Sequence, residues 1–319
     1  MSKEGMGMVN RVQRGQLPSS PMCKIAVIGD IHDQWDEDDA IALKHLGVDL
    51  VLFVGDFGNE AVELVRAIAN LDLPKAAIFG NHDAWYTATD WGRSKSPYDH
   101  RVEDRVQQQI DLLGEAYVGY SCLDFPAFNL SVVGGRPFSW GGSAWKNEKF
   151  YLKYFEMQSF ADSTEQIVAA AEDAAFETIL FMGHCGPTGL GSAAEDPCGK
   201  DWQPIGGDHG DPDLEMAIAR TLQQGKTIPL VTFGHMHHQL RHTKTQIRKR
   251  IVVKENGTVY LNAASVPRII RTEEGWRRNF SIVTLESGRV QDAALVWVDQ
   301  DLEIVSEEVL YQSEAQLIL

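Results

Sequence analysis

Short runs of β-branched and other apolar residues recur along the chain, and each of them ends in a glycine. A run of four to eight apolar residues that stops at glycine is typical of a buried strand that breaks into a loop. The pattern therefore predicts six buried strands, at residues 24–29, 50–55, 75–80, 130–134, 178–183 and 228–234.

Amphipathic patterns with helical spacing lie between several of these runs, at residues 37–46, 60–70, 102–113, 164–175 and 213–224. Alternation of strand and helix favours an α/β fold with a largely parallel, layered core. After Gly234 the chain becomes rich in strands, predicted at 251–253, 259–261, 280–285 and 293–298. We expect these later strands to form a second sheet packed on the first.

The domain organisation follows from the ends of the chain and its composition. Residues 1–22 are polar and lack the apolar stretch of a secretory signal, so they are expected to be a disordered lead-in. Residues 23–319 contain no linker or repeat and are expected to be a single domain. No run of 18 apolar residues predicts a membrane span. The four cysteines form no paired motif, which favours a cytoplasmic protein with free thiols.

Charge is distributed unevenly. The formal net charge of -16 argues against binding to nucleic acid, because an acidic surface repels a phosphate backbone. Residues 236–278 nevertheless hold ten basic against three acidic side chains. Two interpretations stay open for this basic stretch: a wall that faces an anionic substrate or partner, or a solvated hairpin at 241–250.

Two predicted loops are unusually long, at residues 84–101 and 185–212, and long loops at strand ends of α/β folds commonly bind ligands. Six of the eight tryptophans lie in or beside the loops that follow the predicted strands, and they could either form a rim that accepts a planar group or pack their own loops. The six are Trp35, Trp85, Trp91, Trp140, Trp145 and Trp202. Within the second loop, Asp201, Asp208 and His209 are candidates to reach a ligand.

Metal-ligating residue types follow the predicted strands. They are Asp30 and His32, Asp56, Asn81 with His82 and Asp83, His184, and His235 with His237. Carboxylate, amide oxygen and imidazole suit divalent first-row metals. Asp30 and His32 are two apart, as are His235 and His237, so on extended segments each pair would leave the same face. Asp56 has two oxygens and could bridge two ions.

Five motifs, in the order in which they occur, resemble those of the calcineurin-like metallophosphoesterase superfamily. They are Asp30-Ile31-His32, Gly55-Asp56, Gly80-Asn81-His82-Asp83, Gly183-His184 and Gly234-His235-Met236-His237. The resemblance covers residues 24–264 and implies a four-layer αββα sandwich of two mixed sheets flanked by helices. It implies two divalent ions (manganese, iron or zinc), one held by Asp30, His32, Asp56 and His237, the other by Asp56, Asn81, His184 and His235.

Two phrases, residues 134–139 and 184–189, resemble a poorly characterised branch of this superfamily from oxygenic phototrophs. The chain lacks the arginine that protein Ser/Thr phosphatases carry after the second motif, since Gly55-Asp56 is followed by Phe57-Gly58-Asn59. Protein dephosphorylation is therefore disfavoured.

The implied activity is hydrolysis of a phosphate ester of a small or medium molecule, by a hydroxide that two metal ions generate from water. In this scheme His82 acts on the leaving group, Asp83 orients His82, and Arg136 either binds substrate phosphate or is a surface arginine. The alternatives are a phosphodiesterase or nuclease acting on nucleotides or nucleic acid, and a metal-binding scaffold without catalysis. The sequence leaves the substrate, the metal and the oligomeric state open.

Overall fold

A computed structural model describes residues 22–243 and 246–313. The lead-in predicted for residues 1–22 thus lies outside the described residues, apart from Met22. The strands are β1 (Cys23–Ile28), β2 (Leu50–Phe53), β3 (Lys75–Ala77), β4 (Cys122–Phe125), β5 (Leu130–Gly134), β6 (Thr178–Met182), β7 (Thr227–Phe233), β8 (Ile251–Val253), β9 (Val259–Asn262), β10 (Ile269–Thr272), β11 (Gly275–Glu286), β12 (Arg289–Asp299) and β13 (Ile304–Gln312).

The α-helices are α1 (Glu37–His45), α2 (Val62–Ala69), α3 (Asp90–Ser94), α4 (Arg105–Leu113), α5 (Glu148–Phe155), α6 (Phe160–Asp173) and α7 (Pro212–Gln223). No helix of the described residues is both long and apolar enough to cross a membrane.

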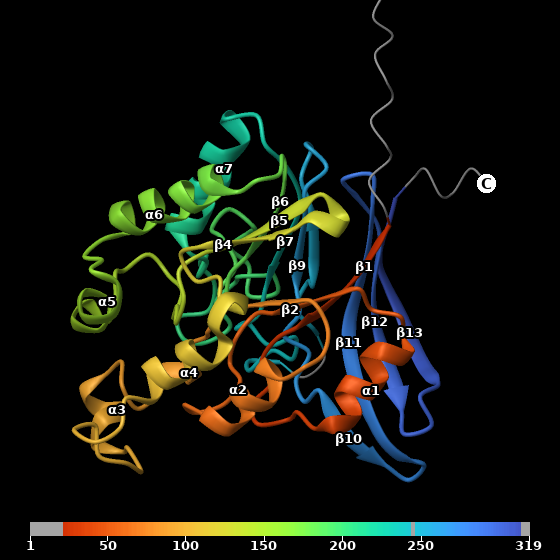
Figure 1. Cartoon of the computed structure of the whole chain (residues 1–319), viewed down its shortest axis with the longest axis horizontal. Coiled ribbons are helices and arrows are strands. Elements are labelled where there is room, and N and C mark those ends of the chain that lie inside the picture. The colour runs from red at the N-terminus through yellow and green to blue at the C-terminus, as the bar shows by residue number, and fades with distance from the viewer. Residues whose placement is uncertain (1–21, 244–245, 314–319) are drawn as a thin grey trace, which may run out of the picture.

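The strands form two mixed sheets (Figure 1). One sheet has the order β13-β12-β11-β1-β2-β3, with β10 paired to β11, and the other has the order β4-β5-β6-β7-β9-β8. The expectation that the strands after Gly234 form a sheet of their own is wrong. β8 and β9 extend the sheet of β5–β7, whereas β11 pairs with β1 and completes the other sheet.

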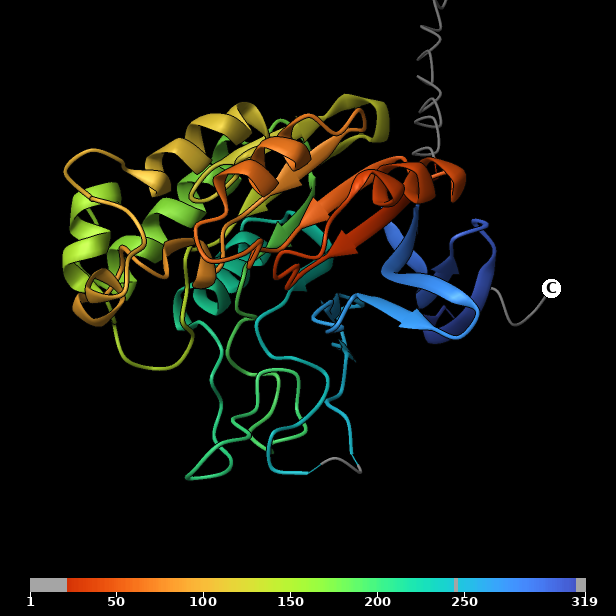
Figure 2. The ribbon, with the colours of Figure 1, turned by 90° about the horizontal axis from the view of Figure 1, so that it is seen from below.

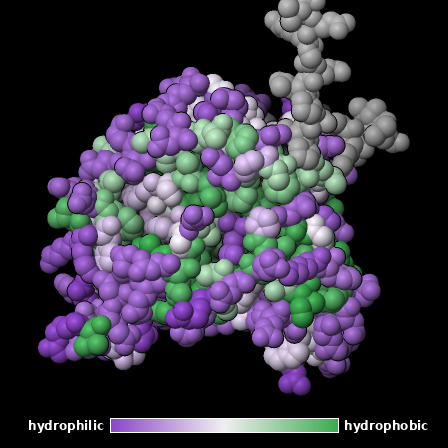
Figure 3. All heavy atoms as spheres, in the orientation of Figure 1, coloured by the Kyte–Doolittle hydropathy of each residue, from purple (hydrophilic) through white to green (hydrophobic). Residues whose placement is uncertain are grey.

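Four layers result, and alternation along the strands explains them. On β1, Ile25 and Val27 belong to a buried cluster between the two sheets, whereas Ala26 and Ile28 belong to a cluster under α1, α2 and α4. A strand that is buried on both faces alternates between two cores in this way. A third cluster joins α6 and α7 to the opposite sheet. The helices lie outermost, and the face seen in Figure 3 is mostly hydrophilic.

The basic stretch contains arginines that neutralise acidic groups inside the fold. Asp36 is the N-cap of α1, and Asp39 completes its capping box. Arg268 pairs with Asp39 at 2.8 Å, and Arg278 pairs with Asp36 at 2.6 Å. Arg248, in the middle of the predicted solvated hairpin, is also buried. The hairpin interpretation therefore fails for Arg248, and these three side chains do not form a surface patch.

The long loop between β6 and α7 lies beside the segment that follows β7 (Figure 2). Arg248 donates to the carbonyls of Ala194, Asp196 and Gly199 at 2.7–2.9 Å, so one buried guanidinium satisfies three carbonyl groups of the loop. The backbone amide of Arg241 donates to the Asp201 carboxylate at 2.8 Å. These bonds fix the two segments to each other at the carboxyl ends of β6 and β7.

Candidate metal centre and active site

The seven predicted metal ligands lie at the carboxyl ends of β1, β2, β3, β6 and β7. β1, β2 and β3 run parallel in one sheet, and β6 and β7 run parallel in the other. Parallel strands end at the same edge of a sheet, so the loops that follow them meet there. Side chains from both sheets thus converge into three overlapping groups of donor atoms, and one of them, His32 with Asp56 and His82, joins the other two.

The first group consists of Asp30, His32 and His237. His237 Nε2 lies 3.2 Å from Asp30 Oδ1 and 3.2 Å from His32 Nε2. His32 Nε2 lies 3.9 Å from Asp30 Oδ1. The two histidines are partly exposed, whereas Asp30 is buried, so this group is open to solvent on one side.

The second group consists of Asp56, Asn81, His184 and His235. His184 Nε2 lies 3.3 Å from Asp56 Oδ1 and 3.1 Å from Asn81 Oδ1. His235 Nδ1 lies 3.2 Å from His184 Nε2. His184 donates from Nδ1 to the Val54 carbonyl at 2.8 Å, which leaves Nε2 free as a ligand atom.

Asp56 lies between the two groups. Its Oδ1 faces His184, and its Oδ2 lies 3.9 Å from His32 Nε2. The amide of His82 donates to Oδ1 at 2.8 Å and fixes the carboxylate in this orientation. Burial opposes ionisation of Asp56, but the neighbouring histidines His184, His82 and His32 together outweigh burial and lower the pKa of the carboxyl. Asp56 is therefore an anion at neutral pH.

These donor sets fit divalent metal ions. Ligand atoms that bind one ion at about 2.0–2.1 Å lie about 3.0–3.4 Å apart, and the closest donor pairs here are separated by 3.1–3.3 Å. Asp30 Oδ1 is buried and accepts no hydrogen bond from the described residues. A cation at this point would satisfy that oxygen.

The ligand residues have unusual backbone conformations. Asp30, His32, Asp56 and His235 have φ values of +52°, +45°, +55° and +66°. Non-glycine residues rarely adopt this left-handed region, and such strain concentrates at functional sites. The expectation that Asp30 and His32 share an extended segment is wrong, because β1 ends at Ile28. Sharp turns after the strand bring these side chains together.

Two glycines allow the close approach of these turns. A Cβ on Gly80 would lie 2.3 Å from Asp56 Oδ1 and 2.5 Å from His184 Cε1. A Cβ on Gly234 would lie 2.2 Å from Asp30 Oδ2. Each glycine that ends a predicted strand here thus leaves space that a ligand side chain fills.

His82 lies beside the cluster, with Nε2 3.9 Å from Asp56 Oδ2. Its Nδ1 is 2.7 Å from Asn59 Oδ1, so Asn59 orients the ring. The expectation that Asp83 orients His82 is wrong. The buried Asp83 carboxylate instead accepts hydrogen bonds from the backbone amides of Asp56, Phe57, Gly58 and Gly80. Asp83 therefore joins the loops after β2 and β3.

Asn59 was not predicted to have a role. It follows the Gly55-Asp56 motif by three residues, at a position where its residue type alone indicates only a turn.

Arg136 is not placed to bind substrate phosphate. Its guanidinium is 2% exposed and donates to Asp211 at 2.5 Å, to Asp213 at 2.9 Å and to Tyr151. Every nitrogen thus has a partner inside the protein. The alternative, a surface arginine in a glycine-proline loop, is also wrong. Arg136 instead connects the loop after β5 to the N-terminus of α7.

A cavity of about 560 Å³ adjoins the metal ligands Asp56, Asn81, His235 and His237. Three of the six loop tryptophans line it, namely Trp85, Trp140 and Trp202, together with Asp201 and His209. Trp35 and Trp145 pack against the buried cluster under the helices. The packing interpretation therefore holds for Trp35 and Trp145, whereas binding of a planar group by the three tryptophans of the cavity stays a prediction. Asp208 is occupied by the backbone amides of Gly189 and Gly210.

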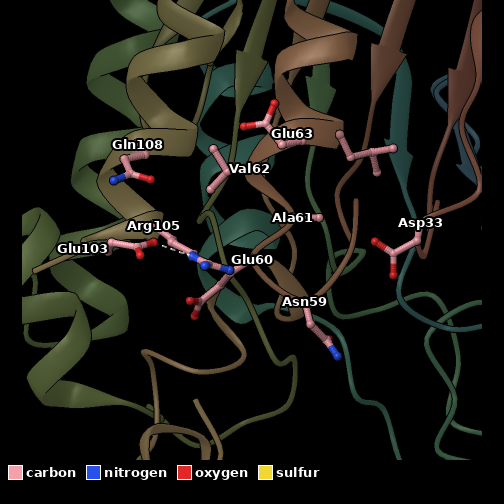
Figure 4. A pocket seen from close by; sticks show the side chains of 10 residues that line it. Asp33, Asn59, Glu60, Ala61, Val62, Glu63, Glu103, Arg105 and Gln108 are labelled. Atoms are coloured by element: carbon pink, nitrogen blue, oxygen red, sulfur yellow. Dashed lines mark hydrogen bonds and ion pairs between the residues drawn. The ribbon is translucent and has the colours of Figure 1, made fainter. Parts of the chain in front are cut away.

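A second cavity, of about 450 Å³, is lined by Asn59 and by residues of α2 and α4 (Figure 4). Its charged side chains are four carboxylates and one arginine that pairs with one of them: Asp33, Glu60, Glu63, Glu103 and Arg105. A site so rich in carboxylates repels phosphate. A phosphate ester is therefore expected to bind in the first cavity, where the metal ligands are.

A layered α/β fold with a cluster of carboxylate, amide and imidazole ligands at its strand ends defines a metal-dependent hydrolase. The family model for calcineurin-like phosphoesterases matches residues 23–239. The chain therefore belongs to the calcineurin-like phosphoesterase family, and it hydrolyses phosphate esters. No curated protein matches the chain.

Three solved structures are similar in fold. A dimetal phosphatase from Danio rerio is 11% identical, with 91% of this chain and 99% of that chain covered and a TM-score of 0.46. TT1561 of Thermus thermophilus is 12% identical, with 84% and 100% covered and a TM-score of 0.46. A purple acid phosphatase from yellow lupin seeds is 13% identical, with 94% and 55% covered and a TM-score of 0.44.

Proposed function

We propose that the protein hydrolyses a small phosphate ester with two divalent metal ions that share one carboxylate. The observation that carries this proposal is the position of Asp56, whose two oxygens face two separate groups of ligand atoms. The first ion would be held by Asp30, His32, Asp56 and His237, and the second by Asp56, Asn81, His184 and His235.

Bound divalent ions supply Lewis acidity toward the phosphoryl oxygens and lower the pKa of a water molecule toward neutrality. The chain's own residues prepare the site for them. Burial opposes ionisation of Asp30, but His237 lowers the pKa of this carboxyl below its ordinary value, so both carboxylates are ionised at neutral pH. The left-handed turns and the Asp83 hydrogen bonds hold the ligands in place without substrate.

His82 is assigned to the leaving group. Asn59 fixes Nδ1, so Nε2 faces the cluster near Asp56 Oδ2. A protonated His82 would donate from Nε2 to the oxygen that departs from phosphorus, and such proton transfer contributes about 10²–10⁴-fold to rates.

The cavity and the charge distribution support a small substrate. A volume of about 560 Å³ lies within the range typical of sites for small molecules. The net charge of -16 opposes nucleic acid, and Arg248, Arg268 and Arg278 of the basic stretch are buried or paired internally. A nuclease would need an exposed basic surface that these side chains do not provide.

The test uses metal-stripped protein that is reloaded separately with manganese, iron or zinc. Hydrolysis of p-nitrophenyl phosphate and bis-p-nitrophenyl phosphate is measured, and the metal content is determined by elemental analysis. Asp56→Asn is compared with Asp72→Asn, an exposed aspartate that pairs with Lys44 at the surface. We expect two ions per chain and metal-dependent turnover in the wild type and in Asp72→Asn. Asp56→Asn should lose both ions and turnover.

The other outcomes separate the alternatives. Loss of a single ion from Asp56→Asn would contradict the shared carboxylate. Two bound ions without hydrolysis of either ester or of metabolite phosphate esters would favour the scaffold. A clear preference for bis-p-nitrophenyl phosphate, with cleavage of single-stranded DNA, would favour the phosphodiesterase or nuclease.

A further inference from the structure

A row of nearly parallel rings leads away from the metal ligands along one wall of the 560 Å³ cavity. The His82 ring stacks on Trp85 with centroids 4.6 Å apart and planes 12° apart. Trp85 in turn stacks on Trp140, with centroids 5.8 Å apart and planes 13° apart. All three rings line the cavity.

The row leaves aromatic surface available to a ligand. Rings in direct face-to-face contact are separated by about 3.5–4.0 Å, whereas the Trp85 and Trp140 centroids are 5.8 Å apart. The two rings are therefore offset, and part of each face is left uncovered by the other. Trp140 Nε1 is buried and has no hydrogen-bond partner among the described residues.

The same cavity contains a lysine without a counter-ion. Lys146 is half-buried, and its Nζ donates to the Gly141 carbonyl at 3.1 Å. Within residues 22–243 and 246–313, no carboxylate lies within ion-pair distance of Lys146. An ammonium group has three donors and its partial burial weakens hydration, so an anionic group of a ligand would stabilise it. Arg241 adds an exposed cation at the rim.

His209 and Trp202 belong to the long loop between β6 and α7, and they connect this loop to the row of His82, Trp85 and Trp140. His209 Nε2 donates to the Trp140 carbonyl at 3.1 Å. The Trp202 ring meets the His209 ring edge to face, with centroids 4.9 Å apart. The loop that carries Asp201 and Trp202 is thus held over the cavity next to Trp140, and the cavity has an aromatic lining from two segments.

We propose that the substrate is a phosphate ester whose leaving group carries a planar aromatic ring system and a second anionic group, the chemistry of a nucleoside bisphosphate. This inference rests on the proposed function, because His82 marks the side of the site to which the leaving group departs. The row that begins at His82 places Trp85 and Trp140 on that side, where the ring system would stack. Lys146 would bind the second anionic group.

The reaction is an ordinary hydrolysis. The oxygen of water forms a new bond to phosphorus, and the bond between phosphorus and the ester oxygen breaks. The electron pair stays on that oxygen, which takes a proton from His82, while the proton that the attacking water loses passes to solvent, from which His82 is protonated again. The products are inorganic phosphate and an alcohol that retains the ring and the second anionic group.

The test compares four substrates that differ in the ring and in the second charge. Adenosine 3′,5′-bisphosphate has both features, adenosine 5′-monophosphate has the ring, fructose 1,6-bisphosphate has the second charge, and glycerol 3-phosphate has neither. The value of kcat/KM is measured for each with the metal-loaded enzyme. We expect the adenosine bisphosphate to have the highest value.

Trp140→Leu is compared with Trp276→Leu, an exposed tryptophan on β11 that does not line the cavity. Loss of one stacking ring should lower the ratio of kcat/KM for ring-bearing over ring-free substrates about tenfold. Trp140→Phe should restore most of that ratio, and Trp276→Leu should leave it unchanged. An unchanged ratio in Trp140→Leu would overturn the stacking site.

Lys146→Met is compared with Lys149→Met, an exposed lysine on α5. The ratio for bisphosphate over monophosphate should fall about fivefold in Lys146→Met, the size of an ion pair near a protein surface. It should not change in Lys149→Met. Equal effects in both variants would remove Lys146 from the site.

A binding measurement separates this inference from the proposed function. Calorimetry is used to titrate adenosine 3′,5′-bisphosphate into the metal-loaded wild-type protein and Trp140→Leu. If none of the four esters is hydrolysed but the bisphosphate binds and Trp140→Leu weakens it about tenfold, the proposed function fails and the aromatic site stands. If turnover occurs with glycerol 3-phosphate preferred, the proposed function stands and the aromatic site is refuted.

Discussion

Replacement of Arg136 by methionine tests whether the buried ion cluster after β5 holds the cavity loops in place. The Arg136 guanidinium and the carboxylates of Asp211 and Asp213 are each about 2% exposed or less, and the two ion-pair distances are 2.5 and 2.9 Å. Removal of one partner from a buried pair leaves an uncompensated charge and costs about 3–5 kcal/mol. Arg136→Met should therefore lower the free energy of unfolding by about this amount.

Arg220→Met is the matched control, because Arg220 pairs with Glu165 at the surface, where the carboxylate is 68% exposed. An exposed pair contributes at most about 1 kcal/mol. Both variants are unfolded in urea at pH 8 with the same metal supply, since bound metal shifts apparent stability. Equal losses in the two variants would refute the assignment of Arg136 to a buried structural cluster.

The loss in Arg136→Met should also depend on pH. Burial raises the pKa of Asp211 to about 7, against the opposing effect of Arg136. A raised pKa in the folded state means that the carboxyl contributes stability at low pH, and that this contribution is lost as the pH rises toward 7. Without the guanidinium the carboxylate has no cation to offset its burial. The destabilisation should therefore be larger at pH 8 than at pH 5, and a loss independent of pH would contradict this reasoning.

Four further substitutions test the site. His82→Ala should retain the bound metal while kcat falls by about 10²–10⁴-fold. Asn59→Leu should also lower kcat, because the His82 ring loses the hydrogen bond that orients it. A full rate in either variant would remove that residue from the mechanism. Gly80→Ala would place a Cβ 2.3 Å from Asp56 Oδ1, so elemental analysis should find reduced metal content. Asp83→Asn replaces an acceptor oxygen by a donor amide opposite backbone N–H groups and should cost about 1–3 kcal/mol in urea unfolding; unchanged stability would contradict its role.

Buried strands were predictable because their signal is local. The apolar run at 130–134 coincides with β5, and the run at 178–183 exceeds β6 by one residue. β13 was not predicted, because seven of its nine residues are exposed and its sequence lacks alternation of apolar and polar positions. The partner of β1 was not predictable either. Its pairing with β11 joins segments about 250 residues apart, and no local pattern encodes that choice.

The convergence of the seven predicted metal ligands was predictable, because strand ends meet whatever the loops do. Their backbone conformation and the roles of their neighbours were not. The contact of Arg136 with Asp211 spans 75 positions, and that of Asn59 with His82 spans 23. Asp83 lies next to His82 in sequence, but its carboxylate turns toward amides of the β2 loop. Proximity in sequence indicated a partner for His82 that tertiary structure does not provide.

The pairing of β1 with β11 limits where the chain can be truncated without loss of a sheet. The part that matches the family ends at residue 239. Strand β9, which pairs with β7, and strand β11, which pairs with β1, both follow that residue. Expression of residues 23–239 alone would keep the pairing of β1 with β2 but remove β11 from its other side, and the amides and carbonyls on that side would be unpaired. Such a fragment is expected to aggregate. The region that matches the family is therefore expected to be too short to fold alone, because both sheets include strands that follow residue 239.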